Sequence, residues 1–175
     1  MPKEHHMRNF TKPQTTLANL PYAAMLLLGA ATVACAFEDP VRGLAIGAAY
    51  VAYGIAGAVW IMVFVCPYCA YYDTRACPCG YGLLAAKLAR KGSRECFAEK
   101  FRRHIPVIVP LWLIPVICGG IALWRGFSWP MVLLMSAFVA DSYVILPLLS
   151  KRHGCKECPQ RDDCPWMARR ARPAG

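Results

Sequence analysis

The chain has 175 residues, of which 57% are hydrophobic, and it carries a formal net charge of +10. This hydrophobic share exceeds the roughly 45–50% of an average soluble domain, which excludes an ordinary soluble fold. The sequence contains neither an aromatic RNA-binding motif nor a recognition-helix pattern, so we expect no nucleic-acid partner. The charge instead fits the basic side of a membrane protein.

Four apolar segments follow one another along the chain. We predict membrane-spanning helices at residues 20–37, 43–66, 105–124 and 129–149, each long enough to cross a hydrocarbon core of about 30 Å. None has the polar face of a helix at the surface of a soluble protein. The predicted fold class is all-α: a polytopic membrane protein with four transmembrane helices embedded in the lipid bilayer.

Lys and Arg are concentrated on one side of these spans. The N-terminal segment 1–19 holds three, the loop 67–104 holds eight and the tail 150–175 holds seven, whereas the two short loops hold only Arg42 and Arg125. The positive-inside rule therefore predicts a multi-pass protein of the inner (cytoplasmic) membrane. Both termini and the central loop of the transmembrane domain (residues 20–149) are expected in the cytoplasm.

The second and third predicted spans have distinct packing signals. Gly43 and Gly47 stand at G-x3-G spacing, which favours the second span as the central packing helix. The third span carries Pro106, Pro110 and Pro115, and these prolines free backbone carbonyls that neighbouring groups must satisfy.

Asp141 lies near the middle of the fourth predicted span. A carboxylate there costs about 2.5–3.5 kcal/mol on insertion scales, so we expect it to face the bundle interior. We expect Asp141 to be protonated, or hydrogen-bonded to Tyr50, Tyr53 or the carbonyls freed by the prolines. Three roles stay open for Asp141: a packing hydrogen bond, a catalytic proton relay and a place in the lining of a transport path.

Eight of the ten cysteines fall on the predicted cytoplasmic side. A reducing cytosol disfavours permanent disulfides, so clustered thiols there are expected to bind metal or to act in redox reactions. The two groups have the spacings C-x2-C-x7-C-x-C and C-x2-C-x5-C, and a C-x2-C pair can reach one ion from a single turn. The predicted metal ligands are Cys66, Cys69, Cys77, Cys79, Cys96, Cys155, Cys158 and Cys164.

The loop thiols at 66–79 can fill one four-thiolate site, and Cys96 with the three tail thiols can fill a second. Mixed assignments fit equally well, and His104 or His153 can replace a thiol. The surrounding Lys and Arg are expected to stabilise thiolates and to lower their pKa. The sequence thus predicts a small Cys-rich cytoplasmic module built from the loop and the tail.

Iron–sulfur centres are the leading cofactor hypothesis, and four of the eight cysteines precede proline, as at the end of bacterial ferredoxin motifs. The predicted function is then membrane-associated electron transfer with a soluble cytoplasmic redox partner. The alternative cofactor is zinc, which would order the module in a structural or partner-binding membrane protein. Assembly as a homo-oligomer and enzymatic activity stay open.

A second alternative comes from the tetrapeptide Cys66-Pro67-Tyr68-Cys69. It resembles the active-site tetrapeptide of glutaredoxins, and four spans with a C-x2-C pair at a helix end resemble membrane oxidoreductases that pass electrons between thiols and quinones. The resemblance implies a membrane thiol oxidoreductase that uses Cys66 and Cys69, with Cys66 as the nucleophile.

Overall fold

A computed structural model describes residues 9–155, 158–161 and 164–165 of the chain. Parts of the predicted N-terminal segment and tail, namely residues 1–8, 156–157, 162–163 and 166–175, lie outside the described residues. The chain divides into two compact units. The first contains residues up to Ala18, Trp60–Ile105 and the chain from Leu149 onward, and the second contains Asn19–Val59 and Pro106–Leu148.

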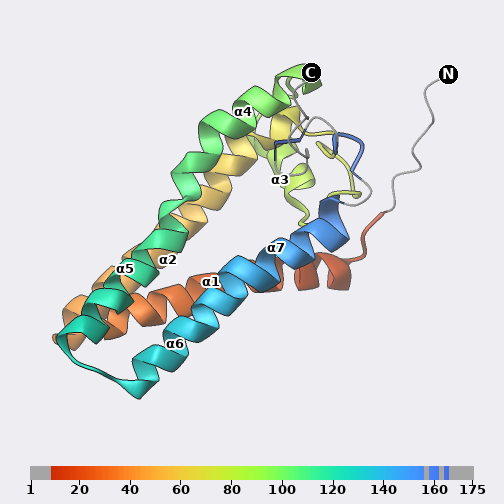
Figure 1. Ribbon diagram of the computed structural model, residues 1–175. Coiled ribbons are helices and arrows are strands. Elements are labelled where there is room, and N and C mark those ends of the chain that lie inside the picture. Colours follow the sequence, from red (N-terminus) through yellow and green to blue (C-terminus); the bar gives the residue numbers. More distant parts are fainter. Residues whose placement is uncertain (1–8, 156–157, 162–163, 166–175) are drawn as a thin grey trace, which may run out of the picture. The chain divides into compact units, whose positions relative to one another are not determined.

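Every regular element in the described part of the chain is helical (Figure 1). Short 3-10 helices and π-helical turns connect or extend the α-helices. The 3-10 helices are η1 (Cys66–Tyr68), η2 (Arg94–Cys96) and η3 (Ile105–Ile108), and the π-helical turns are η4 (Ala140–Ile145) and η5 (Ser150–Cys155). The α-helices are α1 (Lys12–Cys35), α2 (Pro40–Phe64), α3 (Tyr81–Leu88), α4 (Phe97–His104), α5 (Pro110–Arg125), α6 (Trp129–Val139) and α7 (Leu146–Leu149).

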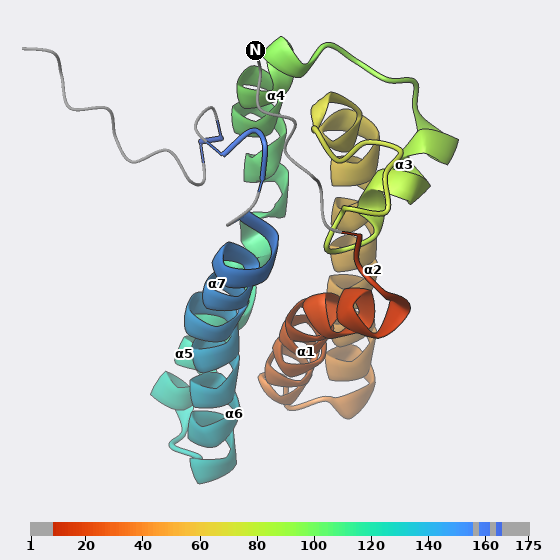
Figure 2. The same ribbon diagram turned by 90° about the vertical axis from the view of Figure 1, so that its right-hand side faces the viewer.

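Four helical segments are long and apolar enough to cross a membrane. They cover Lys12–Cys35, Pro40–Tyr68, Arg94–Arg125 and Trp129–Arg152. The predicted all-α class with four membrane-compatible helices is therefore confirmed. In both views of the second unit, α5 and α6 lie side by side and are joined by a short turn (Figures 1 and 2).

The first two long helices begin where their capping residues stand. Thr11 precedes α1, and its N–H donates to Gln14 Oε1 at 3.0 Å, which is one half of a capping box. α1 therefore starts at Lys12, eight residues before the predicted span at residue 20. The difference arises because the capped first turns are polar and do not contribute to the apolar segment.

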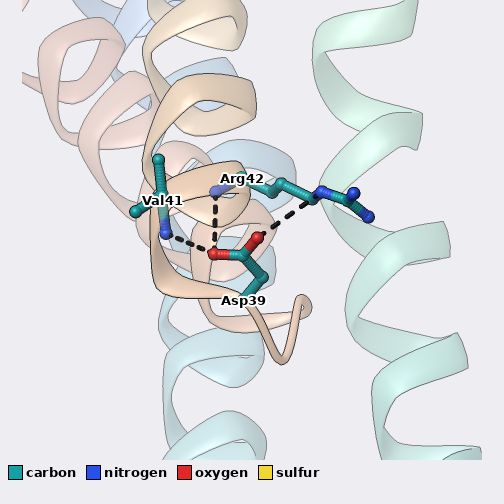
Figure 3. A network of polar contacts seen from close by, with 3 residues as sticks. All are labelled: Asp39, Val41 and Arg42. Atoms are coloured by element: carbon teal, nitrogen blue, oxygen red, sulfur yellow. Dashed lines mark hydrogen bonds and ion pairs between the residues drawn. The ribbon is translucent and has the colours of Figure 1, made fainter.

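Asp39 caps α2 in the same manner (Figure 3). Its Oδ1 accepts the N–H of Val41 at 2.9 Å and the N–H of Arg42 at 3.4 Å. The Arg42 Nε lies 3.5 Å from Asp39 Oδ2, although both side chains are largely exposed and such surface pairs stabilise little. Pro40 occupies the first helical position, where its missing N–H has no helical partner to lose.

α2 is the packing helix of the second unit, as its glycines predict. A Cβ added at Gly47 would lie 3.0 Å from the Ala30 carbonyl oxygen of α1, and one at Gly43 would overlap the Ala34 carbonyl. Only glycine allows the α1 and α2 backbones to approach this closely. Further along, the Tyr22 hydroxyl of α1 donates to the Gly54 carbonyl of α2 at 2.8 Å.

A buried tyrosine satisfies a carbonyl that a proline leaves free. Pro115 lies inside α5 and has no N–H to donate to the carbonyl of Leu111, four residues earlier. The Tyr50 hydroxyl of α2 donates to that oxygen at 2.7 Å. Tyr50 is 4% exposed and belongs to the core of this unit with Met25, Leu26, Leu111 and Phe138.

Asp141 is buried in η4, as predicted, with 7% of its surface exposed. Its predicted bond to Tyr50 or Tyr53 is wrong. Each hydroxyl has one proton to donate, and these two donate to the carbonyls of Leu111 and Val107 in the proline-bearing segment. The Oδ2 atom of Asp141 has no hydrogen-bond partner among the described residues.

We predict that Tyr50→Phe destabilises the second unit. The Leu111 carbonyl would lose its partner in a water-free core, so we expect the free energy of unfolding to fall by about 1–2 kcal/mol. Unfolding in mixed micelles of increasing SDS content measures this change. The control is Tyr143→Phe, because the half-exposed Tyr143 hydroxyl donates only at 3.4 Å, to Trp112 O. Equal losses in the two variants would contradict the assignment.

Candidate functional site

Seven of the eight predicted ligand cysteines lie close enough in the first compact unit for their charges to repel one another if several ionise. Within the loop, Cys66 interacts with the other three thiols, and within the tail, Cys155 interacts with the other two. The pairs Cys69–Cys158 and Cys79–Cys155 join the loop group to the tail group. The seven residues are Cys66, Cys69, Cys77, Cys79, Cys155, Cys158 and Cys164.

The two C-x2-C motifs form backbone turns with the same hydrogen-bond pattern. The Cys69 N–H donates to the Cys66 carbonyl at 3.0 Å, and the Cys158 N–H donates to the Cys155 carbonyl at 3.3 Å. In each motif the N–H three residues after the second cysteine then donates to that cysteine's carbonyl, at 3.1 Å in both. Because side chains three residues apart eclipse in such a turn, each pair of thiols is directed to one side.

The two C-x2-C motifs also have corresponding hydrogen bonds to sulfur. The second cysteine of each pair accepts the N–H of the residue two positions later, Tyr71 for Cys69 and Gln160 for Cys158. The Tyr71 hydroxyl also donates to the sulfur of Cys158. Hydrogen bonds of this kind favour a charged thiolate over a neutral thiol.

Gln160 holds the tail against the loop. Its side chain is 8% exposed, and its Oε1 accepts the N–H of Ala70 at 2.6 Å. Its Nε2 donates to the carbonyls of Tyr68 and Arg94, both at 3.3 Å. Tyr68 and Ala70 flank the second thiol of the loop motif, so one amide fixes the tail beside that thiol.

The loop motif is enclosed on another side by Gly92, which precedes α4, and by Lys100 of α4. The Gly92 N–H donates to the Pro67 carbonyl at 3.0 Å, and a Cβ at Gly92 would overlap the Tyr68 ring. Lys100 Nζ lies 5.5 Å from the centre of that ring, within the range of a cation–π contact. The turn that carries the first two thiols is therefore held by backbone and side-chain contacts together.

Burial acts against ionisation of these thiols. It raises the pKa of Cys69 and of Cys79 to about 12, with a further contribution from neighbouring thiols. The pKa of Cys155 rises to about 11, although Lys151 acts in the opposite direction. The expectation that basic neighbours lower these pKa values is wrong, because desolvation outweighs their charge. Several thiolates here would need a bound cation to offset their repulsion.

The donor chemistry fits a soft metal, while the distances are wider than those of a coordinated ion. Sulfur ligands select zinc or iron–sulfur clusters rather than calcium or magnesium. Within the described part of the chain, however, no three His, Cys, Asp or Glu side chains lie close enough to hold one ion. Binding would require the loop and tail thiols to close toward each other as they lose their protons.

The remaining predicted residues lie at different places. Cys96 ends η2, and the Arg94 carbonyl of the same turn accepts the Gln160 amide, so Cys96 lies near the tail and its ligand role stays a prediction. The His104 ring stacks on Phe64 at 5.0 Å, whereas the His153 side chain lies outside the described residues. Asp141 belongs to the second unit, where its proton-relay role also stays a prediction.

Sequence reasoning missed Tyr71 and Gln160. Both are polar residues beside cysteine motifs, and nothing in their local pattern separates a solvated side chain from a buried bridge. Their one available signal is position, since each follows the second cysteine of a C-x2-C pair by two residues.

No protein-family model, curated protein or solved structure matches the chain.

Replacing Gln160 by Leu should release the tail from the loop. The substitution removes three hydrogen bonds and leaves the Ala70 N–H without its partner, so we expect amide exchange in segment 66–72 to accelerate about 10–100-fold. Hydrogen–deuterium exchange with mass spectrometry measures it. Gln14→Leu, the same change at the start of α1, is the control and should leave this segment unchanged. Unaltered exchange in Gln160→Leu would refute the bridge.

Thiol reactivity checks the effect of burial. With a pKa raised from its ordinary value of 9.0 to about 12, Cys79 holds far less thiolate at pH 8 than an unfolded cysteine. Since the thiolate is the nucleophile, alkylation of Cys79 by iodoacetamide in chelator-treated protein should be at least ~100-fold slower than in guanidinium. Peptide mapping after timed alkylation measures both rates. Similar rates in the two conditions would contradict the burial.

Proposed function

We propose that this protein holds a cysteine-ligated iron–sulfur centre at the surface of the membrane and transfers electrons there. The observation that carries the proposal is the placement of seven thiols from the loop and the tail so near one another that their charges would repel if several ionised. The loop group would supply Cys66, Cys69, Cys77 and Cys79. The tail would supply Cys155, Cys158 and Cys164, with Cys96 as the candidate for a fourth ligand.

The opposing effects on the thiols favour metal binding. Hydrogen bonds from Tyr71 and Gln160 to the sulfurs favour thiolates, whereas burial raises the pKa of Cys69 and Cys158. A bound cation reconciles the two, because metal binding replaces the protons and offsets the charge. A thiol oxidoreductase depends instead on a free thiolate of lowered pKa, and the shifts found for Cys69, Cys79 and Cys155 go the other way.

The number of thiols favours iron–sulfur centres over one zinc ion. A structural zinc site takes four ligands, and the connected group is larger than that. Two adjoining sulfur groups can hold two clusters side by side, as in two-cluster ferredoxins. When bound, such clusters exchange single electrons. The chain's own contribution would be the hydrogen bonds from Tyr71 and Gln160, because hydrogen bonds to sulfur tune a cluster's reduction potential.

The topology of the proposed centre follows from charge. The excess of Lys and Arg in the loop and tail favours the cytoplasmic face of the inner membrane, with both termini on that side. A soluble cytoplasmic redox protein would be the electron partner. An acidic partner surface would complement a chain of net charge +10.

Zinc is the second candidate, and the composition of the loop core favours it. Three of the buried apolar residues of the loop are small, namely Ala70, Ala76 and Ala85, beside the larger Tyr71 and Phe97. So small a core stabilises little by itself, and a zinc ion would order it in the manner of a zinc finger. The protein would then present a metal-stiffened surface for a partner and would have no redox signal.

Anaerobic purification distinguishes the candidates. We expect a brown protein with broad visible absorption that bleaches on reduction, with iron and acid-labile sulfide in comparable amounts. Cys69→Ser and Cys158→Ser should each lose most of the iron. Cys118→Ser, a cysteine of the third span outside the site, is the control and should keep it. A colourless preparation with stoichiometric zinc would contradict the iron–sulfur proposal and support the second candidate.

A further inference from the structure

α3 (Tyr81–Leu88) has two faces of opposite character. One face consists of small residues, Gly82 and Ala85, both of which are buried. The opposite face presents Leu83, Leu84 and Leu88, which are 40%, 48% and 54% exposed. Three leucines exposed together on two helical turns form an apolar patch that water solvates poorly, so this face is suited to an apolar environment.

The small face of α3 packs on the loop that carries the thiols. A Cβ added at Gly82 would overlap the Tyr71 carbonyl and lie 3.2 Å from Cys77 Cβ. The Gly82 carbonyl accepts the N–H of Asp73 at 3.1 Å, and the Tyr72 hydroxyl donates to the Ala89 carbonyl, past the helix end, at 2.8 Å. The leucine face is therefore held in a defined direction by the loop.

α3 also lies where the second membrane span ends. It packs against η1 (Cys66–Tyr68), and these residues are the last of the candidate span Pro40–Tyr68. A helix attached to this turn lies at the level of the bilayer surface. At that level an exposed apolar face meets acyl chains and an exposed cation meets headgroups.

A shallow cationic cavity, open to its surroundings, adjoins the leucine face. It has a volume of about 340 Å³ and lies at the C-terminal end of α3, and no acidic side chain is among the described residues that line it. Lys87, Arg90 and Lys91 contribute three positive charges to its wall, and all three are exposed. The remaining lining residues are Tyr72, Ala86, Leu88 and Ala89.

We propose that this cavity binds the phosphate headgroup of an anionic phospholipid whose acyl chain lies along Leu84 and Leu88. The three cations match a negatively charged phosphate, and clustered Lys and Arg beside a membrane span are the known chemistry of anionic-lipid recognition. Free phosphate shares the cationic part of the site but has nothing to place against the leucines. The adjacent apolar face therefore favours the lipid.

Bound lipid would hold the thiol-bearing loop in a fixed position on the bilayer. The small face of α3 contacts Tyr71 and Cys77, and Tyr71 donates to Cys158, so lipid binding and thiol geometry share one support. This inference does not rest on the identity of the metal. It holds equally for an iron–sulfur centre, for a zinc site and for free thiols.

Native mass spectrometry of the detergent-purified full chain tests the site. We expect phosphatidylglycerol to bind more tightly than phosphatidylcholine with the same acyl chains. The variant Lys87→Gln/Arg90→Gln/Lys91→Gln should weaken phosphatidylglycerol binding about 10–100-fold, in line with the contribution of each cation near a membrane surface. The control Arg75→Gln/Arg102→Gln/Arg103→Gln removes the same charge from other exposed positions and should change binding less than about threefold.

The leucines separate lipid from phosphate. Leu84→Ser/Leu88→Ser should weaken phosphatidylglycerol binding and leave the affinity of the lipid-free protein for inorganic phosphate unchanged. Equal affinity for the two lipids, or equal weakening in the two triple variants, would overturn the proposal. So would phosphatidylglycerol binding that is insensitive to the leucines. If the triple variant on α3 fails to fold in detergent, Arg90→Gln alone serves as the test, with an expected loss of about fivefold.

Discussion

The thiol site depends on the amide of one buried side chain. Gln160 reaches from the tail to the backbone on both sides of Cys69, where its oxygen accepts the Ala70 N–H and its nitrogen donates to the Tyr68 carbonyl, with a further hydrogen bond to the Arg94 carbonyl. A side-chain amide has the same donor and acceptor as a peptide group, so it can pair with backbone that has no strand or helix partner. Together with the hydrogen bond from the Tyr71 hydroxyl to the sulfur of Cys158, this bridge joins the two cysteine groups.

In the second unit, too, a side chain forms a hydrogen bond with a backbone group that local structure leaves unpaired. Pro115 leaves the Leu111 carbonyl without its helical donor in a segment that no water reaches, and the Tyr50 hydroxyl supplies the missing hydrogen bond. In both units a side chain from a distant part of the sequence satisfies main-chain groups that local structure leaves unpaired. Buried polar groups need such partners, because an unsatisfied one costs about 1–3 kcal/mol.

In the two proposals, α3 connects the thiol-bearing loop to the membrane surface. Its small residues allow close contact with the loop at Tyr71, and its leucines and cations face outward. The proposed metal centre and the proposed lipid site thus adjoin two different faces of one short helix. This arrangement explains why a loop so rich in Lys and Arg also exposes leucines.

The sequence by itself determined the all-α class, the four membrane-compatible helices and the two C-x2-C motifs, because apolar length and cysteine spacing are local properties of the chain. Tertiary structure decided which groups meet. The Ala70–Gln160 hydrogen bond joins residues 90 positions apart, and Tyr50 donates to Leu111 rather than to Asp141. Such pairings depend on how backbone groups left unpaired at prolines and turns are brought within about 3 Å of a hydrogen-bond partner, and no local pattern of residues records that distance.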